Sequence, residues 1–313
     1  MNPFYSIIIA LYNKEKFIYD VLLSVYKQSY INYEVIIIDD KSTDQSYRIV
    51  IDFVSNHSDR RCLLYQNIQN MGVGYSRNRG IDLAVGNYII FLDADDILND
   101  KEMLSKVSNY LLFYPIEMLI LTREYMGRHN KPDYKHVKRY IKCIDNDLYK
   151  IINKSKFAYF GRFPFGGSAS SILRKDVLMY RKFDENERMY EDWLFFLDIY
   201  LSRDIVYFLS SICVQINIDP NSLSRSLNNE ERRKLPKVYN LLIEYEEYFL
   251  AKKFFNSWLR SNINTHTSFK SNMKIISNVK KEIIYNIDFS FYGIYNSIII
   301  IIKIILSIIN LKL

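Results

Sequence analysis

The chain has 313 residues, of which 49% are hydrophobic and 25% charged, a composition that supports a globular core and excludes a disordered or collagen-like protein. Its formal charge of +7 comes without a basic cluster interleaved with aromatic residues, so we expect no nucleic acid partner. Basic residues concentrate in 131–156 and 230–281, which suits an anionic substrate or an acidic membrane surface better than DNA.

The three cysteines form no CxxC pair, and the four histidines show no metal-ligand spacing. The first residues, MNPFYSIII, lead straight into an expected strand without the features of a signal peptide. We therefore expect a cytoplasmic protein with free thiols.

The first hundred residues predict alternating strands and helices. Short apolar runs bounded by polar residues are typical of strands buried in a parallel sheet, and they occupy residues 5–11, 34–38, 62–66 and 88–92. Between them apolar residues recur at helical spacing, with Asn13 expected to cap the first helix, Asp44 to cap the second, and Gly72 and Gly74 to mark the turn before the third. Short connections favour a doubly wound, mostly parallel α/β sheet.

After residue 101 the pattern is less regular. It predicts helices over 101–113 and 190–201 and strands at 116–121, 168–173 and 206–218. Residues 123–165 are expected to be irregular, and helices dominate from 230 onward. We place a boundary near residue 228, giving a domain of residues 1–228, with halves 1–100 and 101–228, and a helical C-terminal region of residues 229–313.

The last segment, residues 289–313, is mostly apolar, with Lys303 and Lys312 as its only charges. Its purest stretch, residues 298–309, is shorter than the ~20 apolar residues that a transmembrane helix needs. We expect a helix lying in the bilayer interface, which would place the protein peripherally on the inner face of the cell membrane. The alternatives are a helix that closes the core and a contact between two copies in a homodimer.

Acidic residues gather at the ends of the expected elements. They form the groups Asp39/Asp40, Asp93/Asp95/Asp96 and Glu191/Asp192. Ligands of open α/β sheets bind at the carboxyl ends of the strands, and adjacent carboxylates repel one another unless a cation lies between them. The alternative for Asp95 or Asp96 is a cap on the following helix. Neither GxGxxG nor GxxxxGK[ST] is present, so a divalent ion would have to neutralise the phosphates of a bound nucleotide.

Six motifs occur in order: SIIIALYNKEKFI, VIIIDDKSTD, GVGYSRNRGIDLAVGNYIIFLDADD, GGSASSILRKDVL, FDE and YEDW. This series resembles the family-two glycosyltransferases, which are inverting enzymes with the GT-A fold that use nucleotide sugars. The resemblance runs from about residue 4 to 226. It implies a GT-A (Rossmann-like), mostly parallel sheet flanked by helices, and the sequence pattern adds the helical C-terminal extension after it.

The resemblance implies which residues contact the donor. Ala10 and Tyr12 would lie against the nucleotide. Asp40 would accept a hydrogen bond from the uracil imide, which makes a UDP-sugar the default donor. Arg77 and Asn78 match the RN of the family's helix and would face the donor.

The same resemblance implies the catalytic chemistry. Asp93 and Asp95 match the DxD motif, with Asp93 near the ribose and Asp95 on the Mg²⁺ or Mn²⁺ that bridges the diphosphate. Asp192, in YEDW, matches the catalytic base. The local sequence alone favours another role for Asp192, an acid that satisfies free N–H groups at a helix N-terminus, and the ordered set of motifs reverses that preference.

One motif departs from the family. The run that often reads arginine, hydrophobic residue, histidine, proline, asparagine, serine is here NIDPNS, residues 217–222, with Asp219 in place of the histidine. An ionised aspartate can ligate a hard cation but cannot donate to a phosphate. Ser222, Ser224 and Arg225 would then take over phosphate contact in a closing loop.

These expectations describe a metal-dependent hexosyltransferase of surface polysaccharide biosynthesis, such as capsule assembly. Its acceptor would be a hydroxyl of a saccharide or of a polyprenyl-diphosphate-linked saccharide. Two alternatives stay open: a non-catalytic sugar-binding partner of another transferase, and an aspartyl-nucleophile phosphatase, which also carries D-x-D after an apolar strand.

Overall fold

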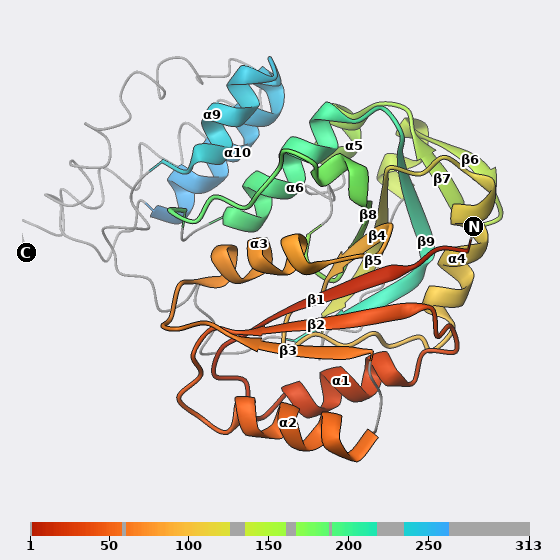
Figure 1. Ribbon diagram of the computed structural model, residues 1–313. Coiled ribbons are helices and arrows are strands. Elements are labelled where there is room, and N and C mark those ends of the chain that lie inside the picture. The colour runs from red at the N-terminus through yellow and green to blue at the C-terminus, as the bar shows by residue number, and fades with distance from the viewer. Residues whose placement is uncertain are drawn as a thin grey trace, which may run out of the picture. The chain divides into compact units, whose positions relative to one another are not determined.

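The computed structural model describes residues 2–57, 61–125, 135–160, 167–187, 190–217 and 235–262 (Figure 1). The chain divides into two compact units, residues 1–222 and 223–313. The expected boundary near 228 and the apolar tail, 289–313, lie outside the described residues. Within the described part, no helix combines the length and hydropathy that crossing a bilayer requires.

The first unit begins with alternating strands and helices. Their bounds are β1 Tyr5–Leu11, α1 Ile18–Tyr26, β2 Tyr33–Asp39, α2 Ser46–His57, β3 Cys62–Gln66, α3 Val73–Leu83, β4 Tyr88–Phe91 and α4 Met103–Phe113. The chain continues with β5 Met118–Tyr125, η1 Lys135–Tyr140, β6 Ile141–Asp145, β7 Leu148–Ile151, α5 Lys154–Phe160, β8 Ser171–Arg174, η2 Lys175–Leu178, α6 Glu191–Ser202 and β9 Val206–Ile216. In the second unit the structure describes α9 Lys237–Glu244 and α10 Tyr248–Asn262.

The strands described in the first unit form one nine-stranded sheet, in the order β3-β2-β1-β4-β8-β5-β9-β7-β6. Strand β1 pairs in parallel with both β2 and β4, so Ile8 lies opposite Ile36 on one side and Phe91 on the other. Strand β8 is antiparallel to β4 and β5. The predicted mostly parallel α/β sheet is confirmed. Because β1, β2 and β4 are parallel, the loops that follow them meet at one edge of the sheet.

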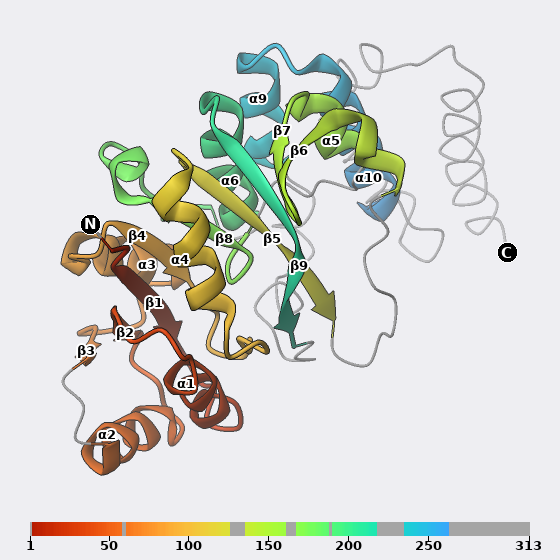
Figure 2. The same ribbon diagram turned by 90° about the vertical axis from the view of Figure 1, so that its right-hand side faces the viewer.

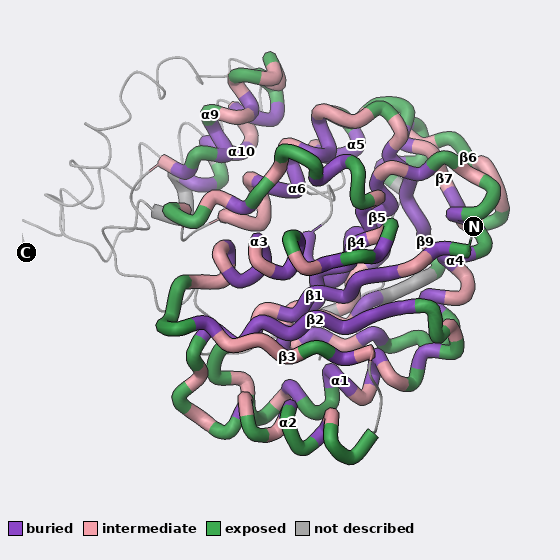
Figure 3. Tube along the Cα trace, viewed as in Figure 1, coloured by how far each residue is buried: buried purple, intermediate pink, exposed green. Residues whose placement is uncertain are grey.

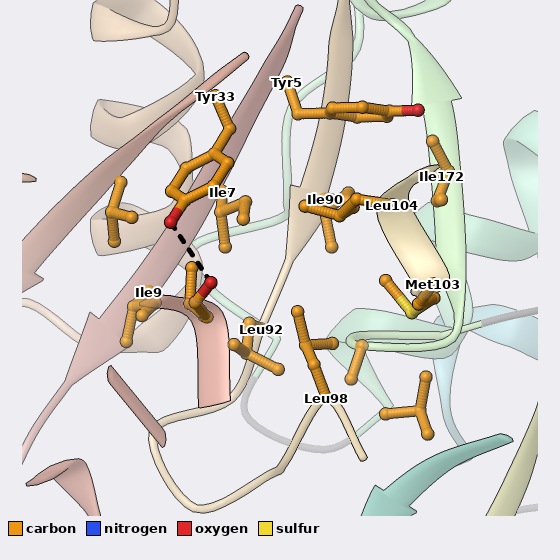
Figure 4. Packing of buried hydrophobic residues seen from close by; sticks show 14 of the residues in the cluster. Tyr5, Ile7, Ile9, Tyr33, Ile90, Leu92, Leu98, Met103, Leu104 and Ile172 are labelled. Carbon is orange, nitrogen blue, oxygen red and sulfur yellow. Dashed lines mark hydrogen bonds between the residues drawn. The ribbon is translucent and has the colours of Figure 1, made fainter. Parts of the chain in front are cut away.

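Helices cover both faces of this sheet (Figures 1 and 2). Buried residues of α1, α2 and α4 pack with every second residue of β1 and β2, including Ile7 and Ile9, in one cluster of the core (Figure 4). Figure 3 shows β1 and β2 as buried along most of their length. On the opposite face α3 approaches β1 so closely that only a glycine, Gly80, fits against Ile8. Phe91 of β4 packs edge-on against Phe195 of α6 on that face. The burial of these strands on both faces explains their unbroken apolar runs.

Two expectations about local structure were wrong. Residues 135–160, expected to be irregular, form η1, the β6–β7 hairpin and α5, and β7 pairs with β9. Both hairpin strands are partly exposed, so their apolar pattern is diluted. Asn13 does not cap α1, which begins at Ile18 after Phe17 without a side-chain cap. The Asn13 side chain instead accepts a hydrogen bond from the amide of Thr43.

Candidate active site

The DADD segment forms a tight turn directly after β4. The amide of Asp96 donates to the carbonyl of Asp93 (3.0 Å), and Ile97 exchanges two backbone hydrogen bonds with Gln215 beside it. Ala94 is buried, and the buried Asp96 carboxylate accepts the amide of Asn217 (3.0 Å). The turn is therefore anchored to the end of β9.

Arg77 of α3 joins this turn to the start of α6. Its guanidinium donates to Asp93 (2.8 Å) and to Glu191 (3.3 Å), and it lies over the ring of Phe183. The Arg77 side chain is 6% exposed, whereas that of Asp93 is 39% exposed. Acidic residues almost one hundred positions apart thus meet on one buried cation.

Asp192 is the second residue of α6 and is partly buried. One of its carboxylate oxygens accepts the amide of Trp193 (2.7 Å). Burial raises the pKa of Asp192 and the nearby Asp93 adds to this effect, while Arg77, the Trp193 amide and Arg123 oppose it. A carboxylate whose pKa is raised is a better proton acceptor near neutral pH.

Glu191 and Tyr190 surround this carboxylate. Burial, and next the charge of Asp192, raise the pKa of Glu191 to about 7 despite Arg77. Tyr190 precedes α6 in the left-handed region, with φ 65°. Its ring packs edge-on against Trp193, with centroids 5.4 Å apart.

Lys14 lies in the loop after β1, next to the DADD turn. Its ammonium donates to Asp95 (2.6 Å), with the two side chains 18% and 15% exposed. The loop containing Lys14 is joined to the loop between β2 and α2, and we call these two loops, residues 12–17 and 40–46, the clasp. The bonds of the clasp run from the amides of Asn13, Lys14 and Glu15 to Ser42, Ser46 and Asp44, and from the amides of Thr43 and Gln45 to Asn13 and Glu15.

Asp40 is buried at the end of β2. Its carboxylate accepts the side-chain amide of Asn67 (2.7 Å) and the backbone amides of Met71 (2.8 Å) and Gly72 (2.7 Å). A carboxylate has about four lone-pair positions, so these bonds leave one for a further donor. Asp40 therefore shapes the loop before α3 and keeps one acceptor position.

Asn78 has a positioning role that the sequence did not predict. Its amide nitrogen donates to the Phe183 carbonyl (3.0 Å) and to Glu185 (2.8 Å), and its oxygen accepts the Phe183 amide (2.7 Å). These three bonds fix the FDE segment, residues 183–185, against α3. These bonds lie within the protein. The expected contact of Asn78 with the donor stays a prediction.

Two further predicted residues lie at the carboxyl end of β1. Ala10 is partly buried opposite Ile38 of β2. Tyr12, 40% exposed, follows the strand and immediately precedes the residues that pair with the 40–46 loop. Their position places both beside the loop that contains Asp40.

The acidic edge fits a divalent ion that a phosphate ligand helps to hold. Among the described residues, no three His, Cys, Asp or Glu side chains are arranged to bind a metal by themselves. Mg²⁺ is commonly held by one or two carboxylates together with substrate phosphates. Asp95 already accepts a cation, the Lys14 ammonium, and burial followed by the charge of Asp93 raises the pKa of Asp96 to about 8. An added cation would therefore reduce the repulsion among these carboxylates.

Sequence reasoning missed Lys14 and Arg123. Arg123, in β5, is close enough to Asp96 and Asp192 to lower the pKa of both. A side-chain carbon at Gly167 would lie 3.2 Å from the Arg123 guanidinium, so this glycine of the fourth motif leaves room for the arginine. Single cations carry no spacing pattern. Lys14 directly follows the YN of the first motif, which was the one local signal for it, and nothing adjacent to Arg123 in the sequence marks that residue. Asp219, Ser222, Ser224 and Arg225 lie outside the described residues.

The family model described as "Glycosyl transferase family 2" matches residues 6–180. The chain belongs to this family. It is 43% identical over 111 residues to an uncharacterized glycosyltransferase of Haemophilus influenzae, a match covering 35% of this chain and 43% of the relative. It is 36% identical over 117 residues to the UDP-Glc:alpha-D-GlcNAc-diphosphoundecaprenol beta-1,3-glucosyltransferase WfaP of Escherichia coli, covering 37% and 43%. The matches span less than half the length of these two relatives.

Solved structures show the same fold. The S. aureus TarS fragment 1–349 with UDP-GlcNAc matches this family 2 protein with a TM-score of 0.63 at 22% identity, covering 81% of this chain and 72% of TarS. The Pyrobaculum calidifontis mannosyltransferase PcManGT with GDP-Man and Mn²⁺ matches with a TM-score of 0.57 at 14% identity, covering 99% and 87%. The predicted GT-A architecture is thereby confirmed.

Proposed function

We propose that this family 2 glycosyltransferase transfers a sugar from a UDP-sugar to a hydroxyl group with inversion at the anomeric carbon. The observation that carries the proposal is the convergence of Asp93, Glu191 and the adjacent Asp192 around the Arg77 guanidinium. This arrangement puts a candidate proton acceptor near the carboxyl ends of the strands, where nucleotide ligands of α/β sheets bind.

Asp192 is the proposed base. Its carboxylate takes the proton of the acceptor hydroxyl, the hydroxyl oxygen forms a bond to the anomeric carbon, and the bond from that carbon to the diphosphate oxygen breaks. The bonding electrons leave with UDP. Arg77 lowers the pKa of both Asp192 and Glu191, against the effect of their burial, and so favours the ionised form of Asp192 that a base requires.

The donor would lie across the ends of β1, β2 and β4. Asp40 has one acceptor position left for the uracil imide, and Tyr12 and Ala10 lie beside it. Asp95, with Asp93 next to it, would hold Mg²⁺ or Mn²⁺, which when bound supplies positive charge to the departing diphosphate. The presence of UDP-GlcNAc in the TarS structure and of Mn²⁺ in the PcManGT structure supports this donor and this class of cofactor.

The acceptor is a saccharide or a polyprenyl-diphosphate-linked saccharide. The printed activity of WfaP, on a diphosphoundecaprenol-linked sugar, supports the lipid-linked class. An acceptor of this kind would place the protein at the inner face of the cell membrane, in the assembly of a surface polysaccharide. Residues 289–313 would provide the membrane contact.

A screen of UDP-sugars for Mn²⁺-dependent release of UDP tests this proposal. We expect one donor to be hydrolysed slowly without acceptor, because water can replace the acceptor hydroxyl. Asp95→Ala should abolish the metal-dependent part of UDP binding in calorimetry. Equal UDP binding with and without Mn²⁺ would remove Asp95 from the metal site, and absence of hydrolysis with every donor would favour a non-catalytic sugar-binding role.

A further inference from the structure

The Lys14–Asp95 pair contains the carboxylate that is proposed to hold the metal of the diphosphate site. Lys14 follows β1 and Asp95 follows β4, and these two strands are neighbours in the sheet. The ammonium lies 2.6 Å from a carboxylate oxygen, and both side chains are mostly buried. A divalent ion that coordinates this oxygen must therefore compete with the ammonium.

Both members of the pair are held in place by their surroundings. The Lys14 amide donates to Ser46 (2.7 Å) within the clasp, and its ammonium lies 5.7 Å from the centre of the Phe17 ring. The turn that contains Asp95 is anchored through Ile97 to Gln215. The contact is thus fixed from two sides, unlike a pair of long side chains that meet on an exposed surface.

We propose that Lys14 is a built-in counter-ion that occupies Asp95 until the donor binds, which makes cation binding and donor binding mutually dependent. This inference rests on the proposed function, since it concerns the donor and the divalent ion together. In the free protein the ammonium neutralises Asp95 and weakens the binding of a divalent ion. The diphosphate then offers the ammonium a second anion, so that Lys14 moves to a phosphate oxygen and Asp95 becomes available to the ion.

The physical consequence is a coupling of two affinities. A positive coupling between two ligands is reciprocal, so the factor by which UDP improves Mn²⁺ binding equals the factor by which Mn²⁺ improves UDP binding. Removal of the ammonium takes a positive charge away from Asp95 in a mostly buried position, where charges interact strongly. Such a carboxylate binds a free cation more tightly, and the coupling to UDP decreases.

Electron paramagnetic resonance titration of the full chain with Mn²⁺, with and without UDP, tests the proposal. In Lys14→Met, which keeps the length and the apolar stem of the side chain, we expect Mn²⁺ to bind about tenfold more tightly without UDP, within the range that coupled sites show. The enhancement by UDP should fall by at least the same factor. Asp95→Asn in the Lys14→Met background should remove the gain, which would assign the tighter site to Asp95.

Lys16→Met is the matched control, because Lys16 is exposed in the same loop and its removal changes the net charge equally. It should leave both Mn²⁺ titrations within about twofold of the wild type. Circular dichroism checks folding, and Lys14→Gln replaces Lys14→Met if that variant unfolds.

Two results would overturn the inference and are distinguishable. If UDP enhances Mn²⁺ binding and Lys14→Met binds Mn²⁺ without UDP no more tightly than the wild type, the counter-ion role is wrong while the proposed function stands. If the wild type binds no Mn²⁺ even with UDP, the metal-dependent part of the proposed function fails as well.

Discussion

Arg77→Met should destabilise the protein strongly, because Arg77 neutralises two acids from different elements. The pair with Glu191 joins two mostly buried groups and contributes about 1.5–3 kcal/mol, as hydrogen bonds between charged groups do. The pair with the more exposed Asp93 contributes about 0.5–1 kcal/mol after discounting for solvent. Methionine retains a contact with Phe183, so the expected loss in the free energy of unfolding is about 2–4 kcal/mol.

Urea unfolding followed by circular dichroism measures this loss. A cycle with Glu191→Gln should give an interaction energy of about 1–2 kcal/mol, since glutamine keeps a hydrogen-bond acceptor but no charge. Arg48→Met is the control, because Arg48 pairs with Asp52 on the surface, where the two side chains are 70% and 53% exposed. This variant should lower the free energy of unfolding by less than about 0.5 kcal/mol. If Arg77→Met lowers the free energy of unfolding no more than Arg48→Met does, Arg77 does not stabilise the fold through a buried charge cluster.

Three further predictions concern the surroundings of the site. Asn78→Ala removes three hydrogen bonds to residues 183–185 and should lower the free energy of unfolding by about 2–3 kcal/mol, measured by urea titration; a loss below 0.5 kcal/mol would contradict the positioning role. The pKa of Glu191 is raised from 4.5 to about 7, so the folded state binds more protons than the unfolded state between these pH values, and stability should fall as pH rises across that range. Glu191→Gln should flatten the pH dependence of the melting temperature. An unchanged slope would show that Glu191 does not cause this pH dependence. Gly86→Ala would place a carbon 2.6 Å from the Ser6 amide nitrogen and should lower the free energy of unfolding by about 1–3 kcal/mol. Gly74→Ala, whose nearest contact is 3.4 Å, should not lower it. Equal melting temperatures of the two variants would show that the Gly86 contact relaxes freely.

The strands of the first hundred residues could be read from the sequence because β1, β2 and β4 are buried on both faces, and because polar loops flank all four strands, including the more exposed β3. The 62–66 strand matches β3 residue for residue, and Tyr88–Phe91 differs from its prediction by one residue. The β6–β7 hairpin was missed because its strands are partly exposed at the end of the sheet. Asn13 was misassigned because local sequence favours a cap, whereas the loop after β2 provides the partner for its side chain.

The acids of the candidate site could be named from the sequence because the ends of parallel strands converge and the motifs mark them. Which group pairs with which acid could not be read in this way. Lys14 reaches Asp95 only through the adjacency of β1 and β4, and Asn78 is satisfied by a segment more than one hundred residues away. Such pairings follow from tertiary packing, which leaves no spacing signal in a single sequence.

The central claim is that Asp192 is the proton acceptor of a sugar transfer from a UDP-sugar. The most direct measurement compares turnover and UDP affinity of the wild type, Asp192→Asn and Glu191→Gln with the donor found by the UDP-sugar screen. We predict that Asp192→Asn loses about 10²–10⁴-fold in turnover while it binds UDP with Mn²⁺ as the wild type does, and that Glu191→Gln retains most of its turnover. Wild-type turnover by Asp192→Asn would contradict the claim.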